Sequence, residues 1–289
     1  MWFILALVSA LAVSVRQVRL KQLMSEYGQF KLGFVVQALS LPIILAATLL
    51  GKQFINPVTL GLSFWWPTLT VCIVFFPINV FLYTQAIKHG ELSKILPIQS
   101  LKPLMAMLFA WILLAETPSQ PGIAGIAVIV LGIYVLHLKQ RRLHNPLRPF
   151  IEDRRSLYML LGVISVSIML TLDKIAMQES NAVFYSLVNT LIGSAVLYAC
   201  ALLAREPKVQ LRKRRLGTFI QVGALQSVTS TAYLMALAIG PVAYVSAVRS
   251  SSVMMAAGLG IVYLKETLTR PKIAAFALII FGSALLAVS

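Results

Sequence analysis

Acidic residues are scarce in this chain. Its 289 residues include only 9 Asp and Glu against 25 Lys and Arg, and charged residues are 12% of the total. Soluble domains carry roughly 25% charged residues, so the chain has too little charged surface to be one. Its two cysteines, Cys72 and Cys200, lie inside apolar runs. That placement excludes a disulfide framework and a thiolate metal site, and we expect no metal and no cofactor.

Hydrophobic residues, in contrast, make up 59% of the chain, and its mean hydropathy is +0.86. Most of this content lies in runs close to the roughly 20 residues that cross a bilayer as a helix. The net charge of +16 would suggest nucleic acid in a soluble protein. In a membrane protein it indicates basic loops beside anionic lipids, so membrane lipids are expected partners and nucleic acid is not.

The apolar runs predict an all-α integral membrane protein with ten transmembrane helices. Short polar connectors separate the runs, as expected where backbone in lipid must satisfy its own hydrogen bonds. The first run, MWFILALVSALAVS, resembles a secretory signal but lacks a basic segment before it, so we predict a retained helix. The predicted spans are 2–18, 32–50, 62–86, 92–114, 121–138, 157–175, 182–204, 216–239, 242–264 and 271–288.

The sequence also contains an internal repeat. Shifting the chain by 150 residues places 83–134 over 233–284 without a gap, with 15 identities in 52 positions. The matches include glycines, prolines and acids as well as apolar residues. We therefore predict two five-helix repeats, 1–138 and 157–289, joined by a basic cytoplasmic linker at 139–156.

Five helices is an odd number, so the second repeat is predicted to enter the membrane inverted. The basic residues agree, because 21 of the 25 Lys and Arg fall in the odd-numbered connectors. Cytoplasmic loops are enriched in Lys and Arg. The charge pattern therefore predicts a protein of the cytoplasmic (inner) membrane with both termini outside.

The last part of each repeat contains the same residues at the same spacing. This pattern resembles that of the EamA-type branch of the drug/metabolite transporter superfamily. The stretch GIVYLKETLTRPKIAAFALIIFGSALL (260–286) is the most characteristic. The resemblance implies a ten-helix carrier whose central cavity is bounded by the first, third, fourth, sixth, eighth and ninth helices. The shared residues are Gly90, Glu116, Thr117, Pro121 and Gly132, with Gly240, Glu266, Thr267, Pro271 and Gly282.

Lys102 lies in PIQSLKP (97–103), about ten residues into the predicted fourth helix and thus near the membrane midplane. A cation at that depth costs about 3 kcal/mol and usually faces a cavity. Two alternatives are snorkelling to the headgroups and an internal salt bridge. Snorkelling would need a side chain longer than that of lysine. A salt bridge would need an acid near the midplane, but every acid is predicted to lie in a loop or at a helix end. We therefore predict that Lys102 lines the cavity.

Arg249 is the corresponding cation of the predicted ninth helix. The shift of 150 residues aligns it with Gln99 and aligns Ser252 with Lys102. Each helix thus presents a polar pair at i, i+3 on one face. A salt bridge to Asp173 is the alternative role for Arg249. The predicted substrate-binding residues are Lys102, Arg249, Gln99, Ser100, Ser250, Ser252, Tyr83 and Tyr233.

Several other polar residues have structural alternatives. The equivalent residues Tyr83 and Tyr233 are also typical of interfacial anchors. Pro97 and Pro103 would loosen the helix on either side of Lys102, either to free backbone groups for a cavity or simply to kink the helix. Glu116 and its equivalent Glu266 are predicted to cap helices.

These features favour a secondary transporter that moves a small organic anion, a phosphorylated metabolite or a lipid head by alternating access. Coupling to protons or another ion is a further hypothesis. An exporter of neutral amino acids or amphipathic drugs is the alternative if both cations are structural. The chain has no P-loop motif and no nucleophile–base constellation, so a membrane enzyme is disfavoured, as is a scaffold.

Overall fold

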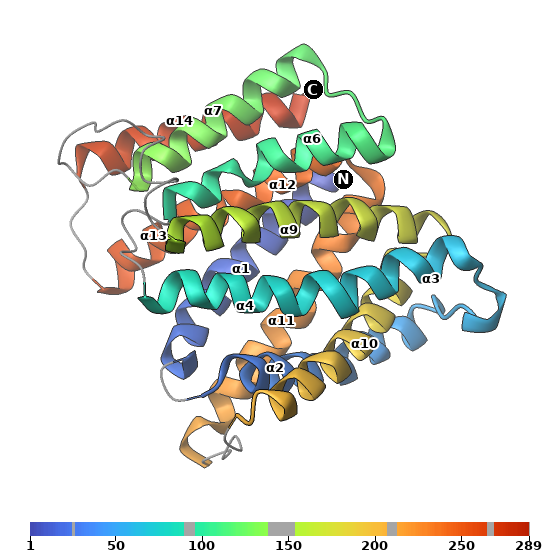
Figure 1. Cartoon of the computed structure of the whole chain (residues 1–289). Helices are drawn as coiled ribbons and strands as arrows, with labels where there is room; N and C mark the ends of the chain where they lie inside the picture. The colour runs from blue at the N-terminus through green and yellow to red at the C-terminus, as the bar shows by residue number, and fades with distance from the viewer. Residues whose placement is uncertain (25–26, 90–95, 138–153, 207–212, 265–268, 289) are drawn as a thin grey trace. The chain divides into compact units, whose positions relative to one another are not determined.

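The computed structural model describes residues 1–24, 27–89, 96–137, 154–206, 213–264 and 269–288, and the described residues form helices and their connectors (Figure 1). Apart from the short 3-10 helix η1 (Pro57–Thr59), they make ten helical segments, two of which contain a change of helix type and a third of which is interrupted at Ser251. The α-helices are α1 (Trp2–Met24), α2 (Gln29–Leu50), α3 (Leu62–Leu69), α4 (Phe76–His89), α6 (Lys102–Leu114), α7 (Gln120–His137), α9 (Arg154–Gln178), α10 (Ala182–Leu203), α11 (Lys213–Ile239), α12 (Val242–Ser250), α13 (Ser252–Leu264) and α14 (Arg270–Val288).

Six segments of the described chain are long and apolar enough to cross a membrane. The predicted span 62–86 matches one of them in both bounds, although its middle is a π-helix, η2 (Thr70–Phe75). A π-helical turn inside an α-helix shifts the register of the residues that follow. The predicted linker overlaps the start of α9, which begins at Arg154, and residues 139–153 of it lie outside the described chain.

The chain divides into two compact units. Unit 1 consists of 1–80 and 172–240, and unit 2 of 81–171 and 241–289. Two of the three boundaries fall inside α4 and α9, and the third lies between α11 and α12. Unit 1 thus combines the first helices of one predicted repeat with the corresponding helices of the other, and unit 2 does the same with the last helices.

In unit 1, α2 packs against α10 and α1 packs against α11. The side chain of Asn181, the N-cap of α10, donates to the carbonyl of Gln53 just after α2. At the other end, the Glu206 carboxylate accepts from the backbone amides of Phe30 (3.2 Å) and Lys31 (2.8 Å). The two helices therefore run antiparallel, and Glu206 satisfies amides that the first turn of α2 leaves without partners.

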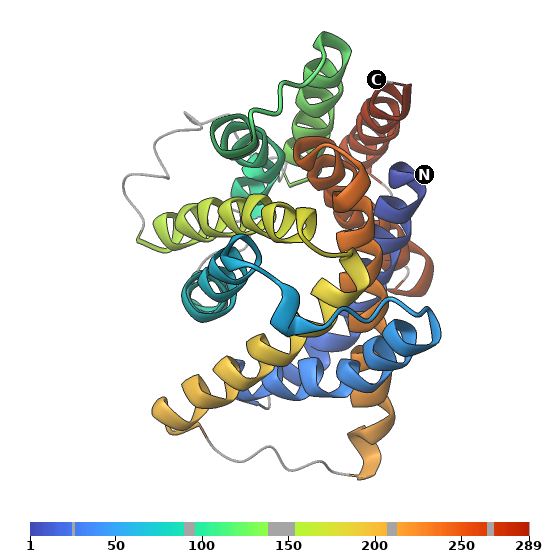
Figure 2. The same cartoon turned by 90° about the vertical axis from the view of Figure 1, so that its right-hand side faces the viewer.

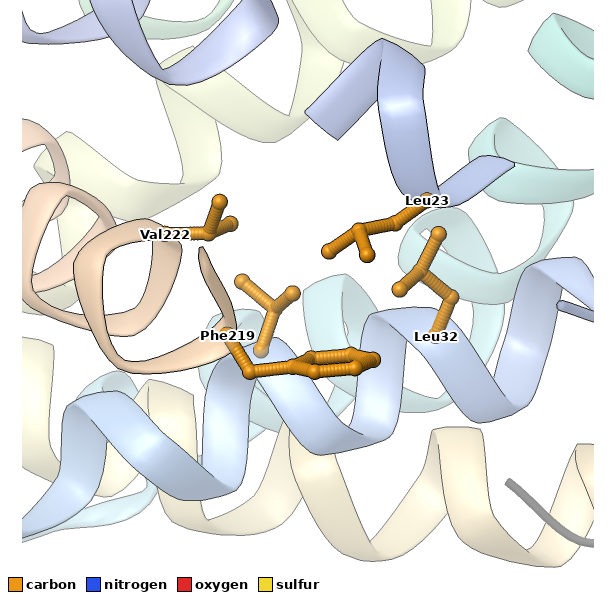
Figure 3. Close-up of a cluster of buried hydrophobic side chains, with 5 residues drawn as sticks. Leu23, Leu32, Phe219 and Val222 are labelled. Atoms are coloured by element: carbon orange, nitrogen blue, oxygen red, sulfur yellow. The ribbon is translucent and has the colours of Figure 1, made fainter. Parts of the chain in front are cut away.

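An apolar cluster joins three helices of unit 1 (Figure 3). Phe219, with none of its surface exposed, lies against side chains of α1 and α2. Burying a side chain of this size away from water contributes roughly 1.5–3 kcal/mol to stability. The cluster consists of Leu23, Leu32, Val36, Phe219 and Val222.

In unit 2, α7 and α14 lie side by side (Figures 1 and 2). Gly132 faces Ile279, and its repeat equivalent Gly282 faces Ile129, so the contacts are reciprocal. Residue numbers rise along α7 while the numbers of their neighbours fall along α14. The two helices therefore pack antiparallel.

Glu116 connects the two predicted repeats within unit 2. It follows the last turn of α6, and its Oε2 accepts from the backbone amide of Val242 at 2.9 Å. The N-cap residue of α12, Pro241, makes no side-chain cap of its own. The prediction that Glu116 caps a helix is thus confirmed, whereas Glu266 lies outside the described residues.

Candidate functional site

Lys102 is the first residue of α6, directly after the 3-10 helix η3 (Leu96–Leu101). The prediction of a continuous helix around it is therefore wrong. Pro103 has no amide hydrogen and suits the first helical positions, which explains a restart at this point. The 13 residues of α6 span about 20 Å, which agrees with the predicted depth of Lys102 in a membrane about 30 Å thick.

The predicted ninth helix is interrupted at the equivalent position. It consists of α12 and α13, and Ser251 between them has φ −63° and ψ −11°. Its equivalent Leu101, before α6, has φ −75° and ψ −11°. The hydroxyl and the amide of Ser251 both donate to the carbonyl of Val248. A serine that bonds back to the preceding turn competes with the helical ladder, which accounts for a break without proline.

The two predicted cations lie in the same unit, on α6 and α12, which pack against each other. Lys102 and Arg249 interact electrostatically through their like charges, and both side chains are partly exposed. The carbonyl of Lys102 lies 3.5 Å from the Ser167 hydroxyl, which also donates to Val163. Like charges brought together in a low-dielectric region repel, so this arrangement favours the arrival of an anion.

The other predicted site residues of unit 2 surround the two breaks. Gln99 belongs to η3, and its buried Nε2 makes no hydrogen bond within the described chain. Ser252 is the first residue of α13 and is 6% exposed, while Ser250 donates to the carbonyl of Ser246. Ser100 is buried in η3. The structure therefore brings six of the eight predicted residues to the paired helix breaks.

The two predicted tyrosines fall in different units. Tyr83 belongs to unit 2 and packs on the apolar cluster that includes Ile98 and Met159. Tyr233 belongs to α11 in unit 1 and is only 4% exposed. A fully packed side chain is not an interfacial anchor, which leaves the cavity role of Tyr233 as a prediction.

Asp173 is the acid whose position differs most from expectation. It lies more than a turn inside α9, is 7% exposed, and accepts a 2.5 Å hydrogen bond from the Tyr185 hydroxyl. Asn189 in turn donates to that hydroxyl oxygen at 3.2 Å. The expectation that every acid lies in a loop or at a helix end is therefore wrong. The pairing of Asp173 with Arg249 stays a prediction.

Arg16, in unit 1, is a cation that the sequence did not single out as a candidate. It falls near the end of the predicted span 2–18, but α1 continues to Met24, and Arg16 Nη1 donates to Gln226 Oε1 of α11. The sequence did contain one indication of a polar contact here, because the polar run QSVTST (226–231) lies within the otherwise apolar predicted eighth helix. A partner for Arg16 could not be identified without the packing of α1 on α11.

Comparisons with known proteins agree with this architecture. None of the curated proteins compared with the chain matches it. One solved protein, described only as a crystal structure of a protein, superimposes with a TM-score of 0.80 at 16% identity. The match covers 99% of this chain and 96% of that one, and at this identity it shows the fold alone.

The profile of the EamA-like transporter family matches residues 1–138 and 155–288. It covers nearly the whole chain, and the apolar helices agree with a multi-pass membrane protein. The resemblance seen in the sequence is thereby confirmed. The chain belongs to the EamA-like transporter family, whose members are membrane transporters.

Proposed function

We propose that this protein is a secondary transporter of a small organic anion, a phosphorylated metabolite or a lipid head, working by alternating access in the cytoplasmic membrane. Family membership shows transport, and the residues of the candidate site support an anionic substrate. The observation that carries the proposal is that Lys102 and Arg249 lie on α6 and α12, which pack against each other inside unit 2.

The energetic cost of placing two cations in the membrane supports an anionic substrate. A single cation near the bilayer centre costs about 3 kcal/mol, and two neighbouring cations cost more because their charges repel. A bound carboxylate or phosphate would offset both contributions through charge-assisted hydrogen bonds. The buried amide of Gln99 offers a further donor beside Lys102.

Backbone geometry supports a binding site at the same place. Carriers commonly bind substrate where transmembrane helices are discontinuous near the midplane. Here α6 and α13 both begin at such a break, at the repeat-equivalent residues Lys102 and Ser252. Each break therefore brings a polar or charged side chain and a helix N-terminus, which favours negative charge.

The proposed topology is two inverted five-helix repeats with both termini outside. Equivalent helices of an inverted repeat must run in opposite directions, and the antiparallel pairs α2/α10 and α7/α14 support this. A reporter fused after Ser289 tests the orientation, because the charge pattern predicts that it is accessible only from outside. Accessibility from the cytoplasm would overturn the orientation.

A ligand screen followed by one substitution tests the substrate class. Purified protein is heated with a panel of inorganic phosphate, phosphorylated sugars, mono- and dicarboxylates and neutral amino acids. We expect an anion to raise the melting temperature, and Lys102→Gln to remove that effect and its transport in reconstituted vesicles. Lys52→Gln is the matched control, since it removes an equal charge from an exposed connector. Unchanged anion transport by Lys102→Gln would refute the proposal.

A further inference from the structure

The chain crosses between the two units at three places, and the crossings differ in kind. Two of them lie inside helices, between residues 80 and 81 in α4 and between residues 171 and 172 in α9. The third lies between Gly240 and Pro241, in the connector of α11 and α12. Any movement of one unit against the other has to be taken up at these crossings, and only the third offers backbone torsions outside a helix.

Unit 1 holds the first half of this connector. The amide of Gly240 donates to the carbonyl of Ala236 at 2.9 Å, which continues the last turn of α11. The carbonyl of Gly240 accepts from Lys174 Nζ at 2.7 Å, and all three residues belong to unit 1. A cation at the C-terminal end of a helix also interacts favourably with the helix dipole. The peptide plane that joins Gly240 to Pro241 is therefore fixed to unit 1.

Unit 2 holds the second half of the connector. The carbonyl of Pro241 accepts from the amide of Val245 at 3.0 Å, in the first turn of α12. The amide of Val242 donates to Glu116 Oε2 at 2.9 Å, and all four residues belong to unit 2. The peptide plane that joins Pro241 to Val242 thus has both its carbonyl and its amide bound within unit 2.

The two planes meet at the Cα atom of Pro241, where only one backbone torsion is soft. The pyrrolidine ring confines φ to about −65°, and φ is −62° here. The peptide bonds on either side are planar and do not rotate. This leaves ψ of Pro241, which is 137°, as the dihedral about which the two held planes can turn. The connector therefore has the geometry of a joint with a single axis.

The internal repeat shows that proline is specific to the connector that crosses between units. Gly240 aligns with Gly90, but Pro241 aligns with Glu91. The elements on either side of that stretch of the first repeat, the end of α4 and α6, both belong to unit 2, so the chain has no crossing to make there. The glycine is common to both connectors, whereas the proline occurs where the units are joined.

We propose that Pro241 is the joint about which unit 2 turns against unit 1 during transport, with Lys174 and Glu116 as the positioning residues that fix its two sides. The inference rests on the proposed alternating access and adds to it the place and the single axis of the movement. Confining the connector to one soft torsion reduces the conformational entropy that is lost when either end state forms. A connector that serves only as a turn would gain nothing from this restriction.

The decisive variant is Pro241→Gly, which frees φ and removes none of the hydrogen bonds that hold the two planes. Spin labels at Ala204→Cys in unit 1 and Arg154→Cys in unit 2, both exposed sites, report the distance between the units by double electron–electron resonance. The parent for all variants carries Cys72→Ala and Cys200→Ala. We expect the distance distribution in Pro241→Gly to widen by about 1.5-fold or more, because glycine is not confined to the φ range of proline.

Transport kinetics test whether the joint is used. In reconstituted vesicles, Pro241→Gly should lower the maximal transport rate of the panel anion that best stabilises the parent by about threefold or more, since the freed torsion has to be ordered in each cycle. The KM for that anion should stay within about twofold of the parent value, because no residue of the candidate site is changed.

A second variant and a matched control complete the set. Lys174→Met releases the carbonyl of Gly240 from unit 1 and should widen the distance distribution as Pro241→Gly does. Pro57→Gly makes the same substitution at the start of η1, a connector that lies wholly within unit 1. It should leave both the width and the maximal rate at the parent values.

The outcomes separate this inference from the proposed function. Parent widths in both Pro241→Gly and Lys174→Met would overturn the joint, and so would equal widening in Pro57→Gly and Pro241→Gly. Widening in Pro241→Gly with an unchanged maximal rate would overturn its role in transport. The widths are measured without substrate, so widening in a parent that transports none of the panel anions would refute the anionic substrate and leave the joint supported.

Discussion

Substituting Gly282 by alanine tests the antiparallel packing of α7 and α14. A Cβ atom added at Gly282 would lie 2.8 Å from the carbonyl oxygen of Gly125 and 3.0 Å from the amide nitrogen of Ile129. Both neighbours are backbone atoms, so the helices must separate to admit the methyl group. Overpacking of this kind costs typically 1–3 kcal/mol, and the higher helix propensity of alanine offsets at most about 1 kcal/mol. We expect a net loss of about 1–2 kcal/mol.

The repeat gives this prediction an internal check. A Cβ added at Gly132 would lie 2.7 Å from Ile279 Cγ1 and 3.1 Å from the carbonyl oxygen of Ala275. Gly132→Ala should therefore destabilise by a similar amount as Gly282→Ala. The double variant should cost less than the sum of the two, because helices already separated at one point admit the second methyl more easily.

Gly258→Ala is the matched control, because a Cβ added there meets nothing within 4 Å. Its stability should equal that of the wild type or exceed it by up to about 1 kcal/mol. All four variants can be compared by thermal unfolding in detergent, followed by far-UV circular dichroism. Equal midpoints for Gly282→Ala and Gly258→Ala would refute the close packing of α7 on α14.

Three further substitutions test polar contacts inside the units. Tyr185→Phe removes the donor to the buried Asp173 carboxylate and should cost about 1.5–3 kcal/mol, measured by thermal unfolding; an unchanged midpoint would contradict the contact. Glu116→Ala should cost about 1 kcal/mol, and Glu116→Gln less, because an amide oxygen can still accept from Val242. Glu206→Ala leaves two amides at the start of α2 without their acceptor, so hydrogen exchange there should accelerate while exchange in α14 does not.

The positions of the helices could be predicted because apolar runs of membrane length leave few alternatives. The predicted span 62–86 coincides with one candidate membrane span, although α4 continues to His89. The sequence also indicated a disturbance of the helix around Lys102, since Pro97 and Pro103 lie on either side of it. The break at Ser251 was not, because it depends on hydroxyl groups that bond back to the preceding turn, and serine inside an apolar run usually continues a transmembrane helix.

Only those residues of the candidate site that the internal repeat aligns could be predicted from the sequence. Aligning the halves linked Lys102 with the helix that carries Arg249, and the structure places both in one unit. Arg16 has no counterpart in that alignment, and its position at the end of an apolar run is typical of a connector. Its contact is with α11, more than 200 residues away, and no local pattern reveals that contact.

Reciprocity of the contacts links the fold to the proposed mechanism. In an inverted repeat, the two states of alternating access are related by an exchange of conformations between the halves. An interface built from equivalent residues, such as Gly132 with Ile279 and Gly282 with Ile129, is unchanged by that exchange and can stay rigid. The breaks at Leu101 and Ser251 are equivalent in position but differ in cause, proline in one and serine in the other. Under the proposed mechanism, we therefore expect movement between the two states at these breaks, which adjoin Lys102 and Arg249.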